Sequence, residues 1–517
     1  MKRLLSIDRL VVLAVALSLS CSSGPDGSDP ATSSSDATPT GDTPPLETPP
    51  PETPPPAAPS PYDALPAEVR SALGRPFTGD LDQMVERRLI RAGVVFNRTQ
   101  YFIDEGVQRG MAYEALRLFE DELNERFETG SLAVHVAFVP MSRDALFPAL
   151  VEGTVDLVAA TLTITPERQR LVDFSNPTRT GVAEIVVSGP AAAPVSSVDD
   201  LSGQEVFVRR SSSYYESLVG LNESLASRGL APVKISEAPE ALEDDDLLEM
   251  VNAGLVSLTI VDDFVAEFWS QVFPAVRLHR EAAVRSGGSI GVAVRKTNPE
   301  LLRAANLWIE KHGPRTAFGN IVERRYLGDT KYVTNATEDA ERRKFDALAR
   351  LFRTYADRYD VDYLLMAAQG YQESRLEQST RSRVGAIGVM QIMPATGREL
   401  EVGNIEELEP NIHGGVKYMR RLMDQYLADE PIDPVNRMLL AFASYNAGPG
   451  RIRQLRRETA ERGLDPNVWF GNVERITSER IGRETVQYVS NIFKYYVAYR
   501  LTLAQAERRR AAESERR

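Results

Sequence analysis

The spacing of hydrophobic residues divides the chain into stretches of different kinds. Residues 22–61 are rich in Pro, Ser and Thr and show no apolar periodicity, and we expect an extended, disordered tether over residues 22–79. Residues 80–328 alternate strand-like and helix-like runs, and from residue 345 onward the apolar positions keep helical spacing. The pattern therefore predicts a two-lobed α/β module followed by an all-α domain.

Within 80–328, the runs have the lengths expected of strands and helices. The predicted strands are 93–97, 132–139, 155–160, 182–188 and 205–209, and the predicted helices are 111–127 and 143–152. Such βαβ alternation is typical of sheets whose two faces are covered by helices. Polar residues 329–344 predict a linker to the next domain.

The last part of the chain has apolar stripes of helical period. They include Phe345, Leu348, Leu351, Phe352 and Tyr355, and further stripes span 412–426, 434–445 and 484–503. A helical catalytic domain over 345–503 is therefore expected. Residues 504–517 form a charged tail, which we interpret as a solvated helix.

The N-terminus has the pattern of a secretory signal. Lys2 and Arg3 precede a short apolar run that ends at Cys21, the only cysteine in the chain. Residues 1–21 resemble a bacterial lipoprotein signal, although Ser18 stands where leucine is usual. The resemblance implies cleavage before Cys21 and lipidation of that residue; the alternative is an ordinary signal peptide. Ser22 favours a periplasmic protein anchored by lipid to the outer membrane.

Composition narrows the classes of partner and chemistry. The 517 residues allow two or three domains. A net charge of −13 argues against nucleic acid as a partner. Four scattered histidines and one cysteine cannot form a metal cluster or a disulfide framework. We therefore expect neither a metal nor another cofactor.

Glu373 is the candidate catalytic residue. It follows an amphipathic run, Val361, Leu364, Leu365, Ala368 and Tyr371, whose spacing predicts a helix packed into a core. A carboxyl group at the end of a buried helix is desolvated, which raises its pKa toward the value that a general acid needs. The alternative is a glutamate that caps a helix or forms a salt bridge.

Three other stretches would have to converge on Glu373. Gly385 and Gly388 allow close backbone approach and are followed by Met390 and Gln391. A later helix ends at Tyr445-Asn446-Ala-Gly, and a still later one carries Tyr488. Each stretch alone is a weak signal, because glycines usually mark turns and helix ends. Their order within one helical domain is a strong one.

With Glu373-Ser374, these motifs resemble the soluble-lytic-transglycosylase family, relatives of goose-type lysozyme, over about 345–500. One departure is Ser444, where alanine is usual. The resemblance implies that Glu373 cleaves the β-1,4 bond between N-acetylmuramic acid and N-acetylglucosamine in peptidoglycan, leaving 1,6-anhydro ends. It implies substrate binding by the following residues: Ser374, Met390, Gln391, Tyr445, Asn446 and Tyr488.

The α/β module contains a predicted anion site. Thr161 and Thr163 follow a strand, and Arg168 offers a planar fork to a carboxylate. With the run 287–299, this cluster resembles the family 3 periplasmic solute-binding proteins. The resemblance implies that these three residues hold a ligand carboxylate, that Asp262 holds an α-amino group and that Tyr101 covers the ligand. Alternatively, Arg168 forms a surface ion pair with Glu167 or Asp173.

Three accounts of function follow from these patterns. The first is a lytic transglycosylase regulated by an amino acid or muropeptide bound to the α/β module. The second is a lysozyme-type hydrolase, in which water replaces the attacking hydroxyl group. The third is a sensor that binds peptidoglycan without cleaving it. The expected partners are glycan strands, a small ligand and a membrane, and no nucleic acid.

Overall fold

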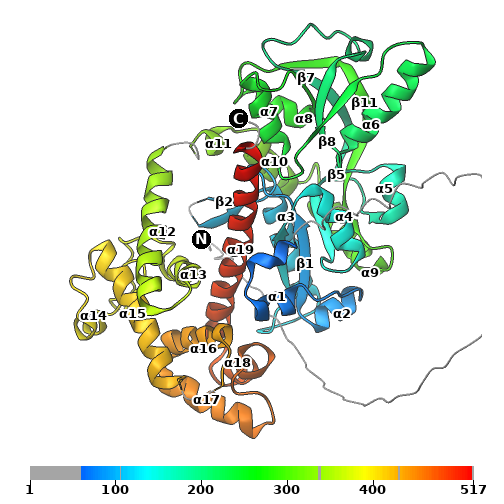
Figure 1. Cartoon of the computed structure of the whole chain (residues 1–517). Coiled ribbons are helices and arrows are strands. Elements are labelled where there is room, and N and C mark those ends of the chain that lie inside the picture. The colour runs from blue at the N-terminus through cyan, green and yellow to red at the C-terminus, as the bar shows by residue number, and fades with distance from the viewer. Residues whose placement is uncertain (1–59, 105, 336–338, 429–430, 515–517) are drawn as a thin grey trace, which may run out of the picture.

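The computed structural model describes residues 60–514 except 105, 336–338 and 429–430. The predicted signal, Cys21 and most of the tether lie outside the described residues. Figure 1 shows a two-lobed α/β module beside a separate group of helices, with one long helix, α19, running from that group along the module. This arrangement confirms the predicted fold class.

The module contains eleven strands and eleven α-helices among its described residues. The strands are β1 Leu89–Val94, β2 Phe102–Asp104, β3 Val107–Arg109, β4 His135–Pro140, β5 Leu157–Thr163, β6 Asp173–Phe174, β7 Arg179–Ser188, β8 Glu205–Arg209, β9 Lys234–Ala238, β10 Leu258–Asp262 and β11 Arg277–Val294. The helices are α1 Ala67–Leu73, α2 Leu81–Glu86, α3 Met111–Arg126, α4 Arg143–Val151, α5 Pro166–Leu171, α6 Ser213–Ser227, α7 Asp244–Asn252, α8 Asp263–Ser270, α9 Pro299–His312, α10 Ala317–Leu327 and α11 Lys331–Asn335.

One sheet passes through both lobes, in the order β10-β7-β11-β5-β1-β4. In the first lobe β1 pairs in parallel with β4 and β5, as βαβ units require. The long antiparallel strands β7 and β11 continue into the second lobe, where β7 pairs with β10. The parallel pair β8–β9 completes that lobe. The two lobes are therefore joined by continuous strands.

The helical domain begins with α12 and ends with α19. Its helices are α12 Asp339–Tyr359, α13 Tyr363–Ser374, α14 Pro394–Leu400, α15 Leu408–Tyr426, α16 Pro434–Ala447, α17 Pro449–Glu461, α18 Glu474–Ile481 and α19 Arg483–Ser514. Leu364, Leu365, Ala368 and Tyr371 of α13 are buried, as the apolar stripe predicts. Among the described residues, no helix is both long and apolar enough to cross a membrane.

Three predicted boundaries are corrected. Residues 60–73, expected in the tether, fold as a short 3₁₀ helix (Pro61–Ala64) and α1, because Tyr62, Leu65 and Leu73 are buried in the core. The expected linker 329–344 contains α11 and the start of α12. The tail is not simply solvated: α19 continues to Ser514, and Arg509 is fixed against the second lobe.

Candidate active site and ligand cleft

Glu373 lies in the last turn of α13. Asp362 caps the N-terminus of the helix, and its carboxylate accepts a hydrogen bond from the Leu364 amide at 2.9 Å. It ends because the next two residues, Arg375 and Leu376, have left-handed φ angles of 59° and 65°. Glu373 therefore stands where the buried helix meets the surface, and its side chain is half-buried.

Two linked hydrogen bonds, of which one reaches Glu373, define the environment of its carboxyl group. The Tyr488 hydroxyl donates a hydrogen bond to Glu373 Oε1 at 2.5 Å, and Gln369 Nε2 donates to the same tyrosine oxygen at 3.1 Å. Burial raises the pKa of Glu373 to about 7, although the Tyr488 hydrogen bond lowers it. The side chain can therefore carry a proton near neutral pH and donate it to an acceptor.

Tyr445 is the second tyrosine of the site. Its hydroxyl donates to the Met390 carbonyl at 2.6 Å, and its ring meets the Tyr418 ring edge to face at 5.2 Å. Burial, and then the charge of Glu373, raise the pKa of Tyr445 well above its usual value. The structure therefore brings the α13, α16 and α19 motifs together, as their order in the sequence predicted.

The loop 385–391, which contains Gly385 and Gly388 and precedes α14, is held in place by hydrogen bonds to Asn411. Asn411 is fully buried; it accepts a hydrogen bond from the Met390 amide and donates to the Ile387 carbonyl, both at 2.8 Å. At Gly388, φ is +77° and a Cβ atom would lie 2.5 Å from Asn411 Nδ2, so glycine is required. Sequence reasoning missed Asn411, whose only signal was an amide beside the apolar stripe 412–426.

Three predicted substrate residues serve the loop itself. The Ser374 hydroxyl donates to the Val389 carbonyl at 2.9 Å, and Gln391 Nε2 donates to the Gly388 carbonyl at 2.8 Å. Met390 is 0% exposed. Asn446 is exposed and accepts a hydrogen bond from the Thr485 hydroxyl at 2.7 Å. Substrate binding by these side chains remains a prediction.

In the α/β module, Arg168 is occupied by the protein's own acceptors. Its Nε donates to Glu216 Oε1 at 3.0 Å, Nη1 to the Thr163 carbonyl at 3.2 Å and Nη2 to the Ser211 carbonyl at 3.1 Å. Burial lowers its pKa. Its ion-pair partner is thus Glu216 of the second lobe, not Glu167 or Asp173. The predicted bond from Arg168 to a ligand carboxylate remains a prediction.

Asp262 of β10 and its cross-strand neighbour Glu184 of β7 form an acidic pair in the second lobe, and Arg285 Nε lies 3.7 Å from Glu184 Oε2. Asp262 is 3% exposed, and burial, followed by the charges of Asp244 and Glu184, raises its pKa well above the usual value. In the described structure, Asp262 Oδ1 and Glu184 Oε1 have no hydrogen-bond partner. A cationic group would satisfy both oxygens.

The other two predicted ligand residues lie in different environments. Thr161, with a left-handed φ of 53°, lines a cavity of about 370 Å³ with Phe264 and Trp308. Tyr101 is 0% exposed, and its ring stacks on Phe138 at 5.3 Å. Its position does not support the predicted role of covering a ligand.

Comparison with known proteins defines the class of each domain. Residues 94–324 match the family described as bacterial extracellular solute-binding proteins, family 3, and residues 350–467 match the transglycosylase SLT domain. The chain therefore carries a match to each of these two domain families, one after the other. The enzyme class predicted from the motifs, a lytic transglycosylase, is confirmed.

The relatives that share this architecture have a common name. The chain is 27% identical to the membrane-bound lytic murein transglycosylase F of Desulfosudis oleivorans, over 77% of this chain and 87% of the relative. It is 29% identical to the protein of that name from Ectopseudomonas mendocina, over 80% and 85%. A solved structure, an ancestral arginine-binding protein bound to glutamine, is 26% identical and covers 47% of this chain and 99% of its own, with a TM-score of 0.39.

Proposed function

We propose that the protein cleaves the β-1,4 bond between N-acetylmuramic acid and N-acetylglucosamine in peptidoglycan, with Glu373 as the acid. The observation that carries this proposal is a carboxyl group with a pKa of about 7 that is hydrogen-bonded to Tyr488. In its protonated form, Glu373 gives its proton to the glycosidic oxygen as the bond to C1 breaks.

The second step returns the proton. Glu373, now a carboxylate, takes the proton of the C6 hydroxyl group of the muramic residue, and the C6 oxygen bonds to C1. The product carries a 1,6-anhydro ring, and no water is consumed. Most glycosidases need a second carboxylate. In the proposed reaction the C6 hydroxyl group of the substrate takes the place of that second carboxylate.

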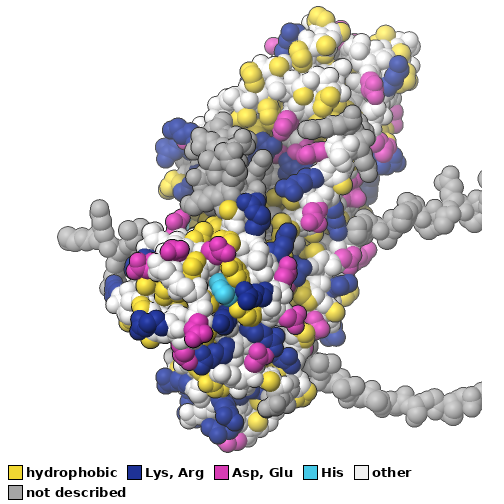
Figure 2. All heavy atoms as spheres, turned by 60° about the vertical axis from the view of Figure 1, so that its left-hand side comes forward, with side chains coloured by type: hydrophobic (Ala, Val, Ile, Leu, Met, Phe, Trp, Pro, Cys, Tyr) yellow, Lys and Arg dark blue, Asp and Glu magenta, His cyan; other side chains and the backbone are white. Residues whose placement is uncertain are grey.

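The surroundings of Glu373 support binding of a long, partly anionic polymer. Tyr445, Asn446, Gln391 and Tyr488 would hold the sugar so that C6 and C1 approach each other. Figure 2 shows many Lys and Arg side chains on the helical domain, and Arg451 of α17 is exposed near the active-site end of α16. These cations suit the carboxylates of peptide stems, although the whole chain has a charge of −13.

Product analysis separates this proposal from the alternatives. Murein digested by the purified protein would yield anhydro ends, lighter by one water than the reducing ends that a hydrolase leaves. If the wild type produced reducing ends, the protein would be a lysozyme-type hydrolase and not a lyase. If Glu373→Gln released as much murein as the wild type, the acid would be another group.

We also propose that the α/β module binds a small ligand with both an ammonium and a carboxylate group, such as an amino acid or a muropeptide. The oxygens of Asp262 and Glu184 that lack partners favour the ammonium group. The ligand carboxylate would displace Glu216 from Arg168. Glu216 is then an internal competitor, and ligand binding would change turnover in the helical domain.

Calorimetry with amino acids and cell-wall peptides tests the ligand proposal. Glu216→Gln should bind the ligand about tenfold more tightly than the wild type, since a charge-assisted pair no longer has to be broken. Glu167→Gln, an exposed neighbour of Arg168, is the matched control and should bind like the wild type. No heat from any variant would contradict ligand binding, and equal turnover with saturating ligand would contradict regulation.

The site of action is proposed from the N-terminal pattern and the names of the relatives. The protein would act in the periplasm, held at the outer membrane by lipid on Cys21, with the tether giving reach. Cys21→Ala should move the protein from the membrane fraction to the soluble fraction. An unchanged membrane fraction would contradict the lipid anchor.

A further inference from the structure

Helix α19 connects the proposed general acid to the interface between the two lobes. Near its start, Tyr488 donates to Glu373. Near its end, Arg509 contacts the start of α7 in the second lobe. The two residues are 21 positions apart, which is about 32 Å of helix at 1.5 Å per residue. Figure 1 shows the helix running from the helical domain to a position beside α7.

Arg509 is fixed by three acceptors. Its guanidinium donates to Asp245 at 3.0 Å, to Asp246, and to the Phe96 carbonyl of the first lobe at 3.1 Å. The Arg509 side chain is only 12% exposed. Arg98 of the first lobe also lies 3.5 Å from Asp245. The end of α19 is therefore bonded to both lobes at once.

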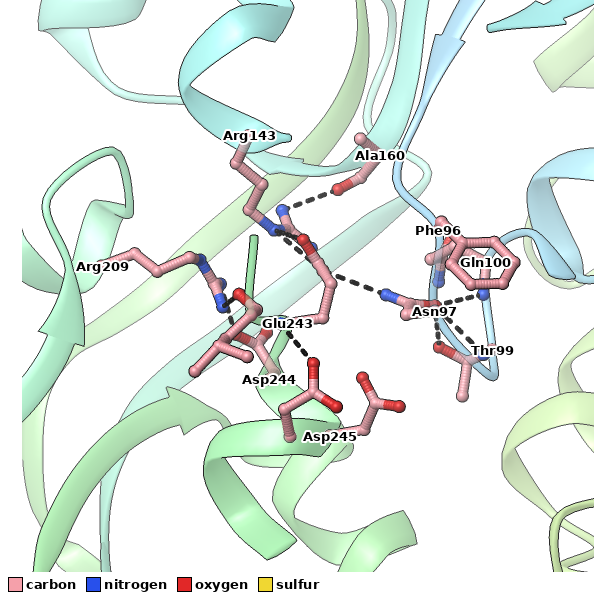
Figure 3. Close-up of polar contacts among 12 residues, drawn as sticks. Phe96, Asn97, Thr99, Gln100, Arg143, Ala160, Arg209, Glu243, Asp244 and Asp245 are labelled. Atoms are coloured by element: carbon pink, nitrogen blue, oxygen red, sulfur yellow. Dashed lines mark hydrogen bonds and ion pairs between the residues drawn. The ribbon is translucent and has the colours of Figure 1, made fainter. Parts of the chain in front are cut away.

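The residue that precedes α7 bridges the lobes directly. Glu243 accepts hydrogen bonds from Arg143 Nη2 at 2.9 Å and from Asn97 at 3.1 Å, both from the first lobe. Figure 3 shows these two side chains reaching Glu243, with Arg209 next to Asp244. Because Glu243 to Asp246 are consecutive, any change in the spacing of the lobes at Glu243 also displaces the acceptors of Arg509.

The middle of α19 is held by the helical domain and the first lobe. Tyr496 donates to Asp362 at 3.0 Å, Arg500 pairs with the same carboxylate, and Tyr499 donates to the Gly106 carbonyl at 2.9 Å. This middle support has Tyr488 on one side and Arg509 on the other. Gln505 Nε2 also donates to the Pro140 carbonyl of the first lobe at 3.1 Å. The helix therefore extends about 12 Å from Tyr496 to Tyr488 and about 6 Å from Gln505 to Arg509, at 1.5 Å per residue. If the helix is stiff, a sideways movement at the Arg509 end is accompanied by a movement in the opposite direction at the Tyr488 end.

We propose that α19 is a lever through which the spacing of the two lobes sets the contact between Tyr488 and Glu373, with Arg509 as the positioning residue. The proposal rests on the proposed function of Glu373. It assigns a specific path to the coupling between the domains. A change in the spacing of the lobes moves the start of α7, which moves Arg509 and with it α19, and α19 carries the Tyr488 hydroxyl group that faces Glu373. The titratable groups that face Glu373 are Tyr488 of α19 and Tyr445 of α16.

A double-mutant cycle on the full-length protein tests the lever, with the pH profile of murein release as the readout. Arg509→Gln should move the basic limb of the profile upward by about 0.5 pH unit, in the same direction as Tyr488→Phe, because Glu373 loses part of a hydrogen bond. The double variant should shift no further than Tyr488→Phe alone. Arg510→Gln, an exposed neighbour on α19, should match the wild type.

An unchanged profile for Arg509→Gln, or shifts that simply add in the double variant, would overturn the lever. If Arg509→Gln does not fold by circular dichroism, Asp246→Asn loosens the same contact and should give the same non-additive shift; additive or absent shifts there would overturn it equally. Glu373→Gln run in parallel keeps the two claims apart: an active Glu373→Gln contradicts the proposed function, whereas an inactive one beside an unshifted Arg509→Gln contradicts only the lever.

Discussion

Glu373 is half-buried and Glu243 is buried, and the two glutamates differ in the charged groups that contact them. No cation contacts Glu373 among the described residues, so burial raises its pKa to about 7. Glu243 is 3% exposed and forms an ion pair with Arg143. At the neighbouring Asp244, burial is outweighed by Arg209 and Arg143, and the pKa is lowered. A guanidinium group thus decides whether a buried carboxyl is an acid or a structural ion.

The largest expected effect is on catalysis. Glu373→Gln keeps the size of the side chain but has no proton to give, so murein release should fall by about 10²- to 10⁴-fold. Release of soluble fragments measured by chromatography checks this loss. Glu406→Gln, an exposed residue of the same domain, is the control and should retain full activity.

A Glu→Gln substitution at Glu243, in the interface between the lobes, should lower stability. Glu243→Gln leaves Arg143 charged and buried without its partner, which should lower the stability of the module by about 2 to 4 kcal/mol. Calorimetric unfolding measures the loss. The double variant Arg143→Gln with Glu243→Gln should recover part of it, and a double variant less stable than the single one would contradict this account of the ion pair.

Glu373→Gln is expected to raise the stability of the protein, whereas Glu243→Gln is expected to lower it. Its pKa is about 7 in the folded protein against an ordinary value of 4.5, so the stability that it contributes is full below pH 4.5 and is lost as the pH rises through 7. Glu373→Gln avoids that loss. At pH 8 it should therefore unfold with a free energy about 1 to 3 kcal/mol higher than the wild type. At pH 5 the two proteins should nearly coincide.

The smallest expected effect is a shift in the pH profile. Tyr488→Phe removes the hydrogen bond that lowers the pKa of Glu373. The basic limb of the activity profile should then move upward by about 0.5 to 1 pH unit. A downward shift would mean that the tyrosine accepts rather than donates this hydrogen bond.

Much of the fold could be predicted from local sequence patterns. The helix Met111–Arg126 and the strand Glu205–Arg209 lie almost where the pattern placed them, because the helix buries one apolar face and the strand is buried on both faces. The ends of the chain were harder to predict from the sequence. Residues 60–73 follow a proline-rich stretch and were expected in the tether, yet Tyr62 and Leu73 are buried in the core. Leu65, Val69 and Leu73 recur at helical spacing, which is a local apolar pattern that the assignment to the tether overlooked.

The candidate site divides in the same way. The motifs around Glu373 could be found because each has its own local signature of glycine, tyrosine and amide. The pairing of Arg168 with Glu216 could not, because these residues lie on different lobes and are 48 positions apart. The contact of Arg509 with Asp245 spans 264 positions, and a run of arginines and glutamates near a terminus ordinarily indicates a solvated surface.

Infrared difference spectroscopy of the wild type against Glu373→Gln tests the protonation of Glu373 most directly. The carbonyl band of a protonated carboxyl group, present only in the wild type, should persist at pH 6 and titrate away with a midpoint near 7. A midpoint near the ordinary value of 4.5, or no such band at pH 6, would mean that this carboxyl is already ionised and cannot be the acid that breaks the glycan.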